Sequence, residues 1–122
     1  MAMRTDQQLF DIMYLGVLKQ GKPSVNNGGC QYRGPNGLKC AAGMLIADRD
    51  YILEIEGEDA KVARERGALK IKKSQVELAL KMQIAHDKNS SFYSNFRWLK
   101  NFKKQAKAVA KKFGLVVPDL PA

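Results

Sequence analysis

The chain has 122 residues, of which 45% are apolar, and a formal net charge of +9 at pH 7. This length supports one hydrophobic core and excludes two full-sized domains, so we expect a single domain over residues 1–122. No run approaches the roughly 18 to 20 uninterrupted apolar residues of a membrane-spanning helix, and no apolar signal stretch follows Met1. Two cysteines, Cys30 and Cys40, are too few for a disulfide scaffold. These features predict a protein with reduced thiols in the cytoplasm, away from membranes.

The charge is concentrated in the second half of the chain. Residues 1–60 contain six basic and eight acidic residues, a net charge of −2, whereas residues 61–122 contain 15 basic and four acidic residues, a net charge of +11. A field of this sign attracts polyanions. The partners that it favours are nucleic acid, an acidic protein or an anionic surface.

Capping patterns and hydrophobic spacing predict the helices in chain order. Thr5 and Gln8 form a capping-box pattern, and apolar residues then recur at helical spacing until Gly21 ends the element. Further along the chain, the composition of residues 58–66 predicts a short helix that ends at Gly67.

The second half of the chain contains two longer helical patterns. Ser74 and Glu77 form another capping-box pattern, which predicts a helix that runs to about His86. The last helix is predicted over residues 91–113, and an extended tail follows over residues 115–122 because of its two prolines. One face of this last helix collects the apolar residues Phe92, Phe96, Leu99, Phe102, Ala106, Val109, Ala110 and Phe113.

The segment that follows the first helix is rich in glycine and predicts irregular structure. Tyr32–Arg33 and Leu38–Lys39 flank a turn sequence at residues 34–37, which predicts a short β-hairpin. Residues 40–47 are expected to form one or two helical turns, and residues 48–56 a turn with a short extended or helical piece. The predicted fold class is therefore mainly α, with about four helices and one small glycine-rich β-hairpin as a minor α+β element.

One face of the last helix also carries a row of basic side chains. At about 100° per residue the row falls within a sector of roughly 80° and extends over some 20 Å. This spacing suits successive contacts to phosphates, and Lys70, Lys72 and Lys73 extend the row if the fold brings them near. The alternatives are a solvated surface and docking of an acidic protein; a membrane surface is disfavoured because the core needs the aromatic face. The row consists of Arg97, Lys100, Lys104, Lys107 and Lys111.

Residues 30–43 read Cys-Gln-Tyr-Arg-Gly-Pro-Asn-Gly-Leu-Lys-Cys-Ala-Ala-Gly. This segment resembles the motif Cys-x-Tyr-Arg-Gly-x-x-Gly-Leu-Lys-Cys-Ala-x-Gly of small uncharacterised bacteriophage and prophage proteins. Beyond the motif, Ala47 stands between Ile46 and Asp48, where these phage proteins usually have a proline. The resemblance implies a viral or mobile-element origin and a role in host takeover or evasion of host defence, inside the bacterial host cell. The likeness continues with Leu45-Ile46-Ala47-Asp48, Tyr51, Glu56-Gly57, Gln83-Ile84-Ala85-His86-Asp87, Trp98, Ala110 and Phe113-Gly114-Leu115.

Arg33, within this motif, has two interpretations. With Tyr32 beside it, the guanidinium can stack on a base or hold a phosphate, which makes Arg33 a candidate nucleic-acid-binding residue. A hairpin with few apolar residues also needs polar cross-links, so Arg33 can instead bind carbonyl groups or Asp48 and fix the loop on the helices. The sequence leaves both interpretations open.

Cys40, His86 and Asp87 are the candidates for catalysis. A helix N-terminus lowers the pKa of a thiol, and a neighbouring His-Asp pair supplies a base and the group that orients it. A cysteine-dependent enzyme is therefore one hypothesis. Against it, a lone cysteine commonly packs as a small hydrophobe, and a histidine at a helix end interacts with the last carbonyl groups.

The sequence predicts neither a metal nor a cofactor. Cys30 and Cys40 are separated by nine residues and have only His86 to complete a zinc site, and the acidic residues 48–59 lack an EF-hand pattern. Those acidic residues are expected to balance the basic half of the chain. No phosphate-binding loop or dinucleotide fingerprint is present.

The function that these features predict is that of a small, basic, phage-type accessory protein. It binds nucleic acid or a nucleoprotein complex through the lysine-rich helix face, without strong sequence preference. The alternative is a protein–protein inhibitor of a host factor or host defence system, and the third hypothesis is the enzyme that uses Cys40 and His86.

Overall fold

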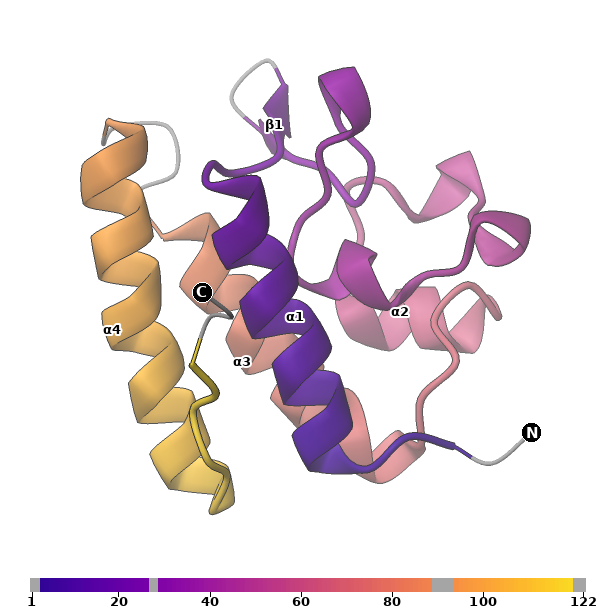
Figure 1. The fold of residues 1–122 in the computed structure, drawn as a ribbon. Coiled ribbons are helices and arrows are strands. Elements are labelled where there is room, and N and C mark those ends of the chain that lie inside the picture. The colour runs from indigo at the N-terminus through magenta and orange to yellow at the C-terminus, as the bar shows by residue number, and fades with distance from the viewer. Residues whose placement is uncertain (1–2, 27–28, 89–93, 120–122) are drawn as a thin grey trace.

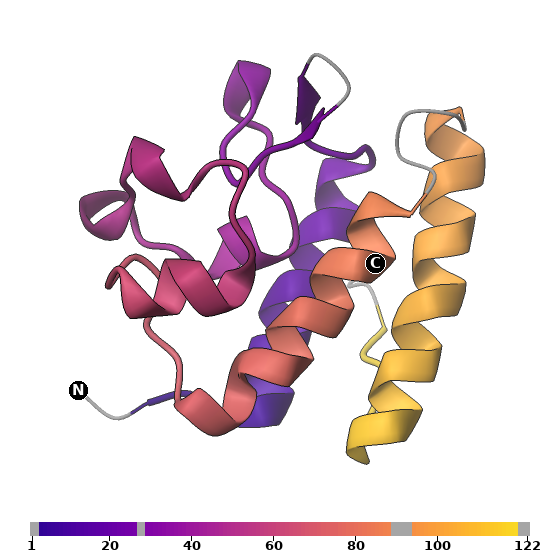
Figure 2. The ribbon, with the colours of Figure 1, turned by 180° about the vertical axis from the view of Figure 1, so that it is seen from behind.

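The structure is a computed structural model that describes residues 3–26, 29–88 and 94–119. Among these residues there are four α-helices, which confirms the predicted mainly α class. Helix α3 packs against each of the other three: α1 lies across it, α4 on one side and the short α2 on the other (Figures 1 and 2). The helices are α1 (Asp6–Gln20), α2 (Ala60–Glu65), α3 (Val76–Asp87) and α4 (Asn95–Phe113).

A chain of ring contacts runs through the core between α1 and α4. Phe10 stacks on Tyr14, and Tyr14 stacks on Phe102 with ring centroids 6.0 Å apart. Phe102 in turn stacks on Trp98, whose ring meets the His86 ring edge-on at 5.4 Å. Aromatic pairs in these offset and edge-on arrangements add stability beyond the burial of their area. The contacts fix α4 on the rest of the molecule through its inner face.

The first helix begins as its sequence predicts. Thr5 Oγ1 accepts a hydrogen bond from the Gln8 amide at 3.1 Å, and Gln8 Oε1 accepts one from the Thr5 amide at 2.8 Å. The helix ends at Gly21, whose φ of 76° is the left-handed conformation that glycine adopts without steric cost. Residues 58–66 likewise contain the predicted short helix, α2, which is capped by Asp59.

The starts of the two later helices differ from the prediction. Helix α3 begins at Val76, after a short 3-10 turn over Lys73–Gln75. The side chain that caps this start is that of Gln75 and not that of Ser74: Gln75 Oε1 accepts a hydrogen bond from the Lys72 amide. Helix α4 begins at Asn95 because Ser94 is non-helical and its Oγ accepts from the Arg97 amide. Residues 91–93, which the prediction included in this helix, lie outside the described residues, as does Phe92.

The β-hairpin predicted over Tyr32–Lys39 is wrong. Residues 35–37 form a single 3-10 turn with Asn36 in a left-handed conformation, and one hydrogen bond from the Gly34 amide to the Leu38 carbonyl closes the loop. A minimal two-residue antiparallel pair occurs earlier instead, between β1 (Val25–Asn26) and β2 (Gly29–Cys30). Residues 40–56 contain three short 3-10 turns, Ala42–Leu45, Asp48–Asp50 and Leu53–Ile55, in line with the short helical turns predicted there.

The end of the described chain returns to α1. The Gln7 side chain donates to the Val116 carbonyl at 2.7 Å and accepts from the Val116 amide at 2.9 Å. This pair of bonds holds the predicted extended tail against the first turn of α1, as far as the tail is described. Within the described ranges, no helix is long and apolar enough to cross a membrane.

Candidate nucleic-acid interface

Helix α4 presents a strongly basic surface on the side that faces away from the core. The helix contains seven basic residues and no acidic ones. Its inner face buries Trp98, Phe102, Ala106 and Ala110, which recur every four residues. The opposite side, here called the α4 outer face, carries Phe96, Arg97, Lys100, Lys103, Lys104, Lys107 and Lys111.

All seven side chains of the α4 outer face are exposed, including the five residues of the predicted row. From Arg97 to Lys111 the row spans about 21 Å at 1.5 Å per residue. The ion pair described on this helix joins Lys112 Nζ to Glu77 Oε1 of α3 at 3.0 Å, at the edge of the face. Within the described part of the chain, no carboxylate pairs with the five lysines of the face.

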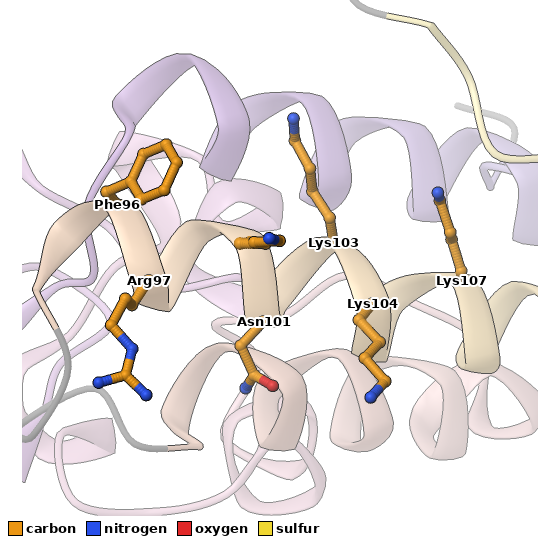
Figure 3. Close-up of a pocket in the computed structure, with 7 residues that line it drawn as sticks. Phe96, Arg97, Asn101, Lys103, Lys104 and Lys107 are labelled. Atoms are coloured by element: carbon orange, nitrogen blue, oxygen red, sulfur yellow. The ribbon is translucent and has the colours of Figure 1, made fainter.

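A shallow open groove of about 680 Å³ runs along this face. Figure 3 shows its two sides: Phe96, Lys103 and Lys107 project one way, and Arg97, Asn101 and Lys104 project the other way. Because every lining residue belongs to α4, the groove is formed by one helix and does not depend on how two elements meet. A ligand that follows it would meet a cation at each helical turn.

The prediction misplaced Phe96 and missed Lys103. Phe96 was expected on the apolar face, but its side chain is 77% exposed and lies among the lysines. At 100° per residue, Phe96 lies about 160° from Trp98, which is fully buried. The predicted apolar face left out Trp98. Once Trp98 and Phe102 together define the inner face, the helical angle alone places Phe96 on the opposite side.

The other predicted cations do not join the α4 outer face. The segment from α2 to α3, which carries Lys70, Lys72 and Lys73, lies across the molecule from most of α4 in both views. Lys70 instead lines a separate hollow beside Arg4 and Arg49. The acidic residues 48–59 also lie on the side of α2, away from α4, so they do not neutralise the face (Figures 1 and 2).

Arg33 is held inside a polar cluster rather than on the α4 outer face. Its Nη2 pairs with Asp48 Oδ1 at 2.7 Å and donates to the Ile46 carbonyl at 3.3 Å. Its guanidinium also lies over the Tyr51 ring, 4.7 Å from the centroid. These contacts match the second interpretation of Arg33, in which the residue fixes the glycine-rich loop.

Glu56 lies at the centre of that cluster. Its carboxylate accepts hydrogen bonds from the amides of Tyr32 and Arg33, at 2.9 and 3.1 Å, and from the Tyr51 hydroxyl at 2.7 Å. We call Tyr32, Arg33, Asp48, Tyr51 and Glu56 the Glu56 cluster. Tyr32 and Arg33 belong to the motif of residues 30–43, and Asp48, Tyr51 and Glu56 to the continuation of the phage resemblance, so these matches coincide with one cross-linked unit of the fold.

Burial and Glu56 shift the ionisation of both tyrosines of this cluster. Burial, followed by the hydrogen bond to Glu56, raises the pKa of Tyr51 to about 12. Burial also raises the pKa of Tyr32 far above its ordinary value, and nearby negative groups add to the effect. Both shifts favour the neutral phenol.

His86 is engaged in a way that opposes a catalytic role. The ring is fully buried, and its Nε2 accepts a hydrogen bond from the Ser24 amide at 3.1 Å, so the proton lies on Nδ1, which donates to Asp87 Oδ1 at 2.9 Å. Asp87 Oδ1 also accepts from Gln83. With both ring nitrogens occupied, His86 has no lone pair with which to activate Cys40.

Cys40 itself is 1% exposed, and its Sγ accepts from the Gly43 amide at 3.4 Å. It contributes to the wall of a hollow of about 550 Å³ together with Tyr32 and Asp87. Among the described residues, no three His, Cys, Asp or Glu side chains are grouped so that they could hold a metal ion.

Comparison of the chain with protein-family models, with curated proteins and with solved structures found no match.

Proposed function

We propose that this protein binds nucleic acid, free or within a nucleoprotein complex, through the α4 outer face and without strong sequence preference. The observation that carries the proposal is the row of exposed lysines on a helix without acidic residues. Such a row neutralises successive phosphates, because lysines three or four residues apart follow one another by about 5 to 6 Å along the axis. Lysine is a point charge and does not read base edges as a planar guanidinium does.

The resemblance of residues 30–43 to small phage proteins supports a place for this activity. We propose that the protein is a phage-type accessory protein that acts in the cytoplasm of the bacterial host, where nucleic acid is accessible to it. A host takeover or anti-defence role would follow from occupying that nucleic acid.

The test is the salt dependence of binding to short duplex and single-stranded oligonucleotides, measured by fluorescence anisotropy. If five lysines each neutralise a phosphate, the logarithm of the association constant falls with the logarithm of salt concentration with a slope of about −4.5 for duplex and −3.5 for single strands. No binding at about 50 mM salt, or a flat response, rejects the proposal.

A triple variant shows whether the α4 outer face is responsible. Lys100→Gln, Lys104→Gln and Lys107→Gln together reduce the magnitude of the slope by about 2 to 3 and weaken binding at least tenfold at low salt. The matched control replaces three exposed lysines elsewhere, Lys19, Lys61 and Lys73, and therefore has the same net charge. If both variants weaken binding equally, the net charge rather than the helix face is responsible.

The competing hypothesis is an acidic host protein as the partner. It is distinguished by a pull-down from bacterial lysate treated with nuclease, in which the triple α4 variant serves as the reference. Retention of a host protein on the unmodified chain alone, combined with no oligonucleotide binding, favours a protein–protein inhibitor and rejects the nucleic-acid proposal.

A further inference from the structure

The most unusual residue of the α4 outer face is Phe96. Its ring is 77% exposed, whereas Trp98 and Phe102 of the same helix are fully buried. A single exposed phenylalanine is common on protein surfaces and needs no explanation by itself. What distinguishes Phe96 is that it lines a groove whose other lining side chains are five cations and one amide.

The ring occupies one end of this groove, on the same side as Lys103 and Lys107 (Figure 3). The next residue, Arg97, projects to the opposite side, so the start of the groove has an aromatic face and a guanidinium next to each other. Farther along, Lys103 and Lys104 repeat the arrangement with two ammonium groups. A ligand that fits this order has a flat apolar group at one point and negative charges at regular intervals beyond it.

Single-stranded nucleic acid has this chemistry, and duplex does not present it. In a single strand, the faces of the bases are open and stack on exposed aromatic rings whatever the sequence. In a duplex, the same faces are covered by neighbouring bases, and inserting a ring between them costs a few kcal/mol of unstacking. The lysines can therefore bind the phosphates of single strands and of duplex, whereas Phe96 contributes only to the binding of single strands.

We propose that the α4 outer face binds single-stranded nucleic acid, with an unstacked base on the Phe96 ring and the following phosphates on the lysines of the groove. The inference rests on the proposed function and names its preferred substrate. It assigns the lysines to the phosphates and Phe96 to the preference for single strands.

The experiment measures the affinity of the full chain for an oligo(dT) of about twelve nucleotides, for an abasic strand of the same length and for a duplex of that length. Phe96→Ala is expected to weaken oligo(dT) binding by about 5- to 150-fold, the usual range for one base–aromatic stack. It leaves binding to the abasic strand and to the duplex within about twofold, because neither offers a base to stack. Phe96→Tyr retains the ring and restores oligo(dT) binding. The same measurements with oligo(U) identify whether RNA or DNA is held more tightly.

Leu53→Ala is the matched control, because Leu53 is 73% exposed and lies on the acidic segment away from α4. It is expected to change none of these affinities.

The result separates this inference from the proposed function. If Phe96→Ala leaves oligo(dT) binding unchanged while the triple lysine variant abolishes it, the inference is wrong and the proposed function stands. Equal losses on oligo(dT), abasic strand and duplex, or a preference of the unmodified chain for duplex, also overturn the inference. If none of the strands binds, both fail.

Discussion

The Glu56 cluster and the α4 outer face are both rich in charged and polar groups, but among the described residues the lysines of the face lack the carboxylate partner that Arg33 has in the cluster. In the cluster, Arg33 meets a carboxylate, a carbonyl and an aromatic ring, and Glu56 accepts three hydrogen bonds. On the α4 outer face, the lysines meet no carboxylate of the described chain. The cation in the cluster stabilises the fold, whereas the lysines of the face repel one another until a polyanion binds.

This difference predicts that substitutions divide into two classes. Changes in the Glu56 cluster lower the free energy of unfolding and leave nucleic-acid affinity unchanged in the molecules that remain folded. Changes on the α4 outer face weaken nucleic-acid binding and leave the free energy of unfolding nearly unchanged. The following predictions test the cluster side of this division, from the largest expected effect to the smallest.

Gly43→Ala is expected to have the largest effect. A Cβ at this position would overlap the Tyr32 carbonyl oxygen and crowd the backbone around it, which would displace Tyr32 from Glu56. Because backbone rather than a flexible side chain must move, we expect a loss of about 3 kcal/mol or more in the free energy of unfolding, measured by urea denaturation.

Gly16→Ala in α1 is the matched control for Gly43→Ala. Its new Cβ would lie 2.8 Å from Sδ and 3.0 Å from Cγ of Met44, a flexible side chain that can rotate away, and alanine also favours the helix. We expect a change within about 1 kcal/mol. Equal losses in the free energy of unfolding for the two variants would show that the close approach of Gly43 to the Tyr32 backbone does not require glycine.

Arg33→Gln is expected to lower the free energy of unfolding by about 2 kcal/mol, because Asp48 and the Ile46 carbonyl lose their partner and Tyr51 loses the cation above its ring. The control is Arg49→Gln, which removes the same charge from an exposed neighbouring position and is expected to cost less than about 0.5 kcal/mol. Both variants should bind oligonucleotides equally. A tenfold loss of affinity for Arg33→Gln alone would return Arg33 to the nucleic-acid-binding residues.

The sequence was sufficient for the features that depend on neighbours along the chain. The Thr5–Gln8 capping box, the Gly21 stop and the outward row from Arg97 to Lys111 all follow from spacing within one helix. The same arithmetic would have placed Phe96 correctly, because it needs only the angle from Trp98.

The Glu56 cluster could not be derived in this way. Glu56 meets Tyr32 and Arg33 across more than twenty residues of irregular chain, and no periodicity relates them. The predicted hairpin failed for the same reason: the amides of Tyr32 and Arg33 bond to Glu56, so they are not available for a strand partner. The sequence offered Arg33–Asp48 as one of two interpretations of Arg33, and the resemblance marked all five residues, but neither indicated that Glu56 joins them.

Tyr51→Phe provides the smallest and most specific test of the cluster. Phenylalanine keeps the ring beneath Arg33 and removes only the hydroxyl that donates to Glu56, so we expect a loss of about 1 kcal/mol at neutral pH. The pH dependence is more informative. The unfolded chain releases the Tyr51 proton near the ordinary pKa of 10.0, whereas the folded protein retains it until about 12.

The free energy of unfolding therefore falls as pH rises from about 10 to about 12, because in this window the folded state binds more protons than the unfolded state. Tyr51→Phe should show a shallower fall, while the contributions of Tyr14 and Tyr32, whose pKa values burial also raises, are common to both proteins and cancel in the comparison. Urea denaturation across this range, with phenolate absorbance recorded in parallel, measures both quantities. Parallel curves for the two proteins would mean that Glu56 does not hold the Tyr51 hydroxyl, and the cluster would then lose one of the three bonds that distinguish it from the α4 outer face.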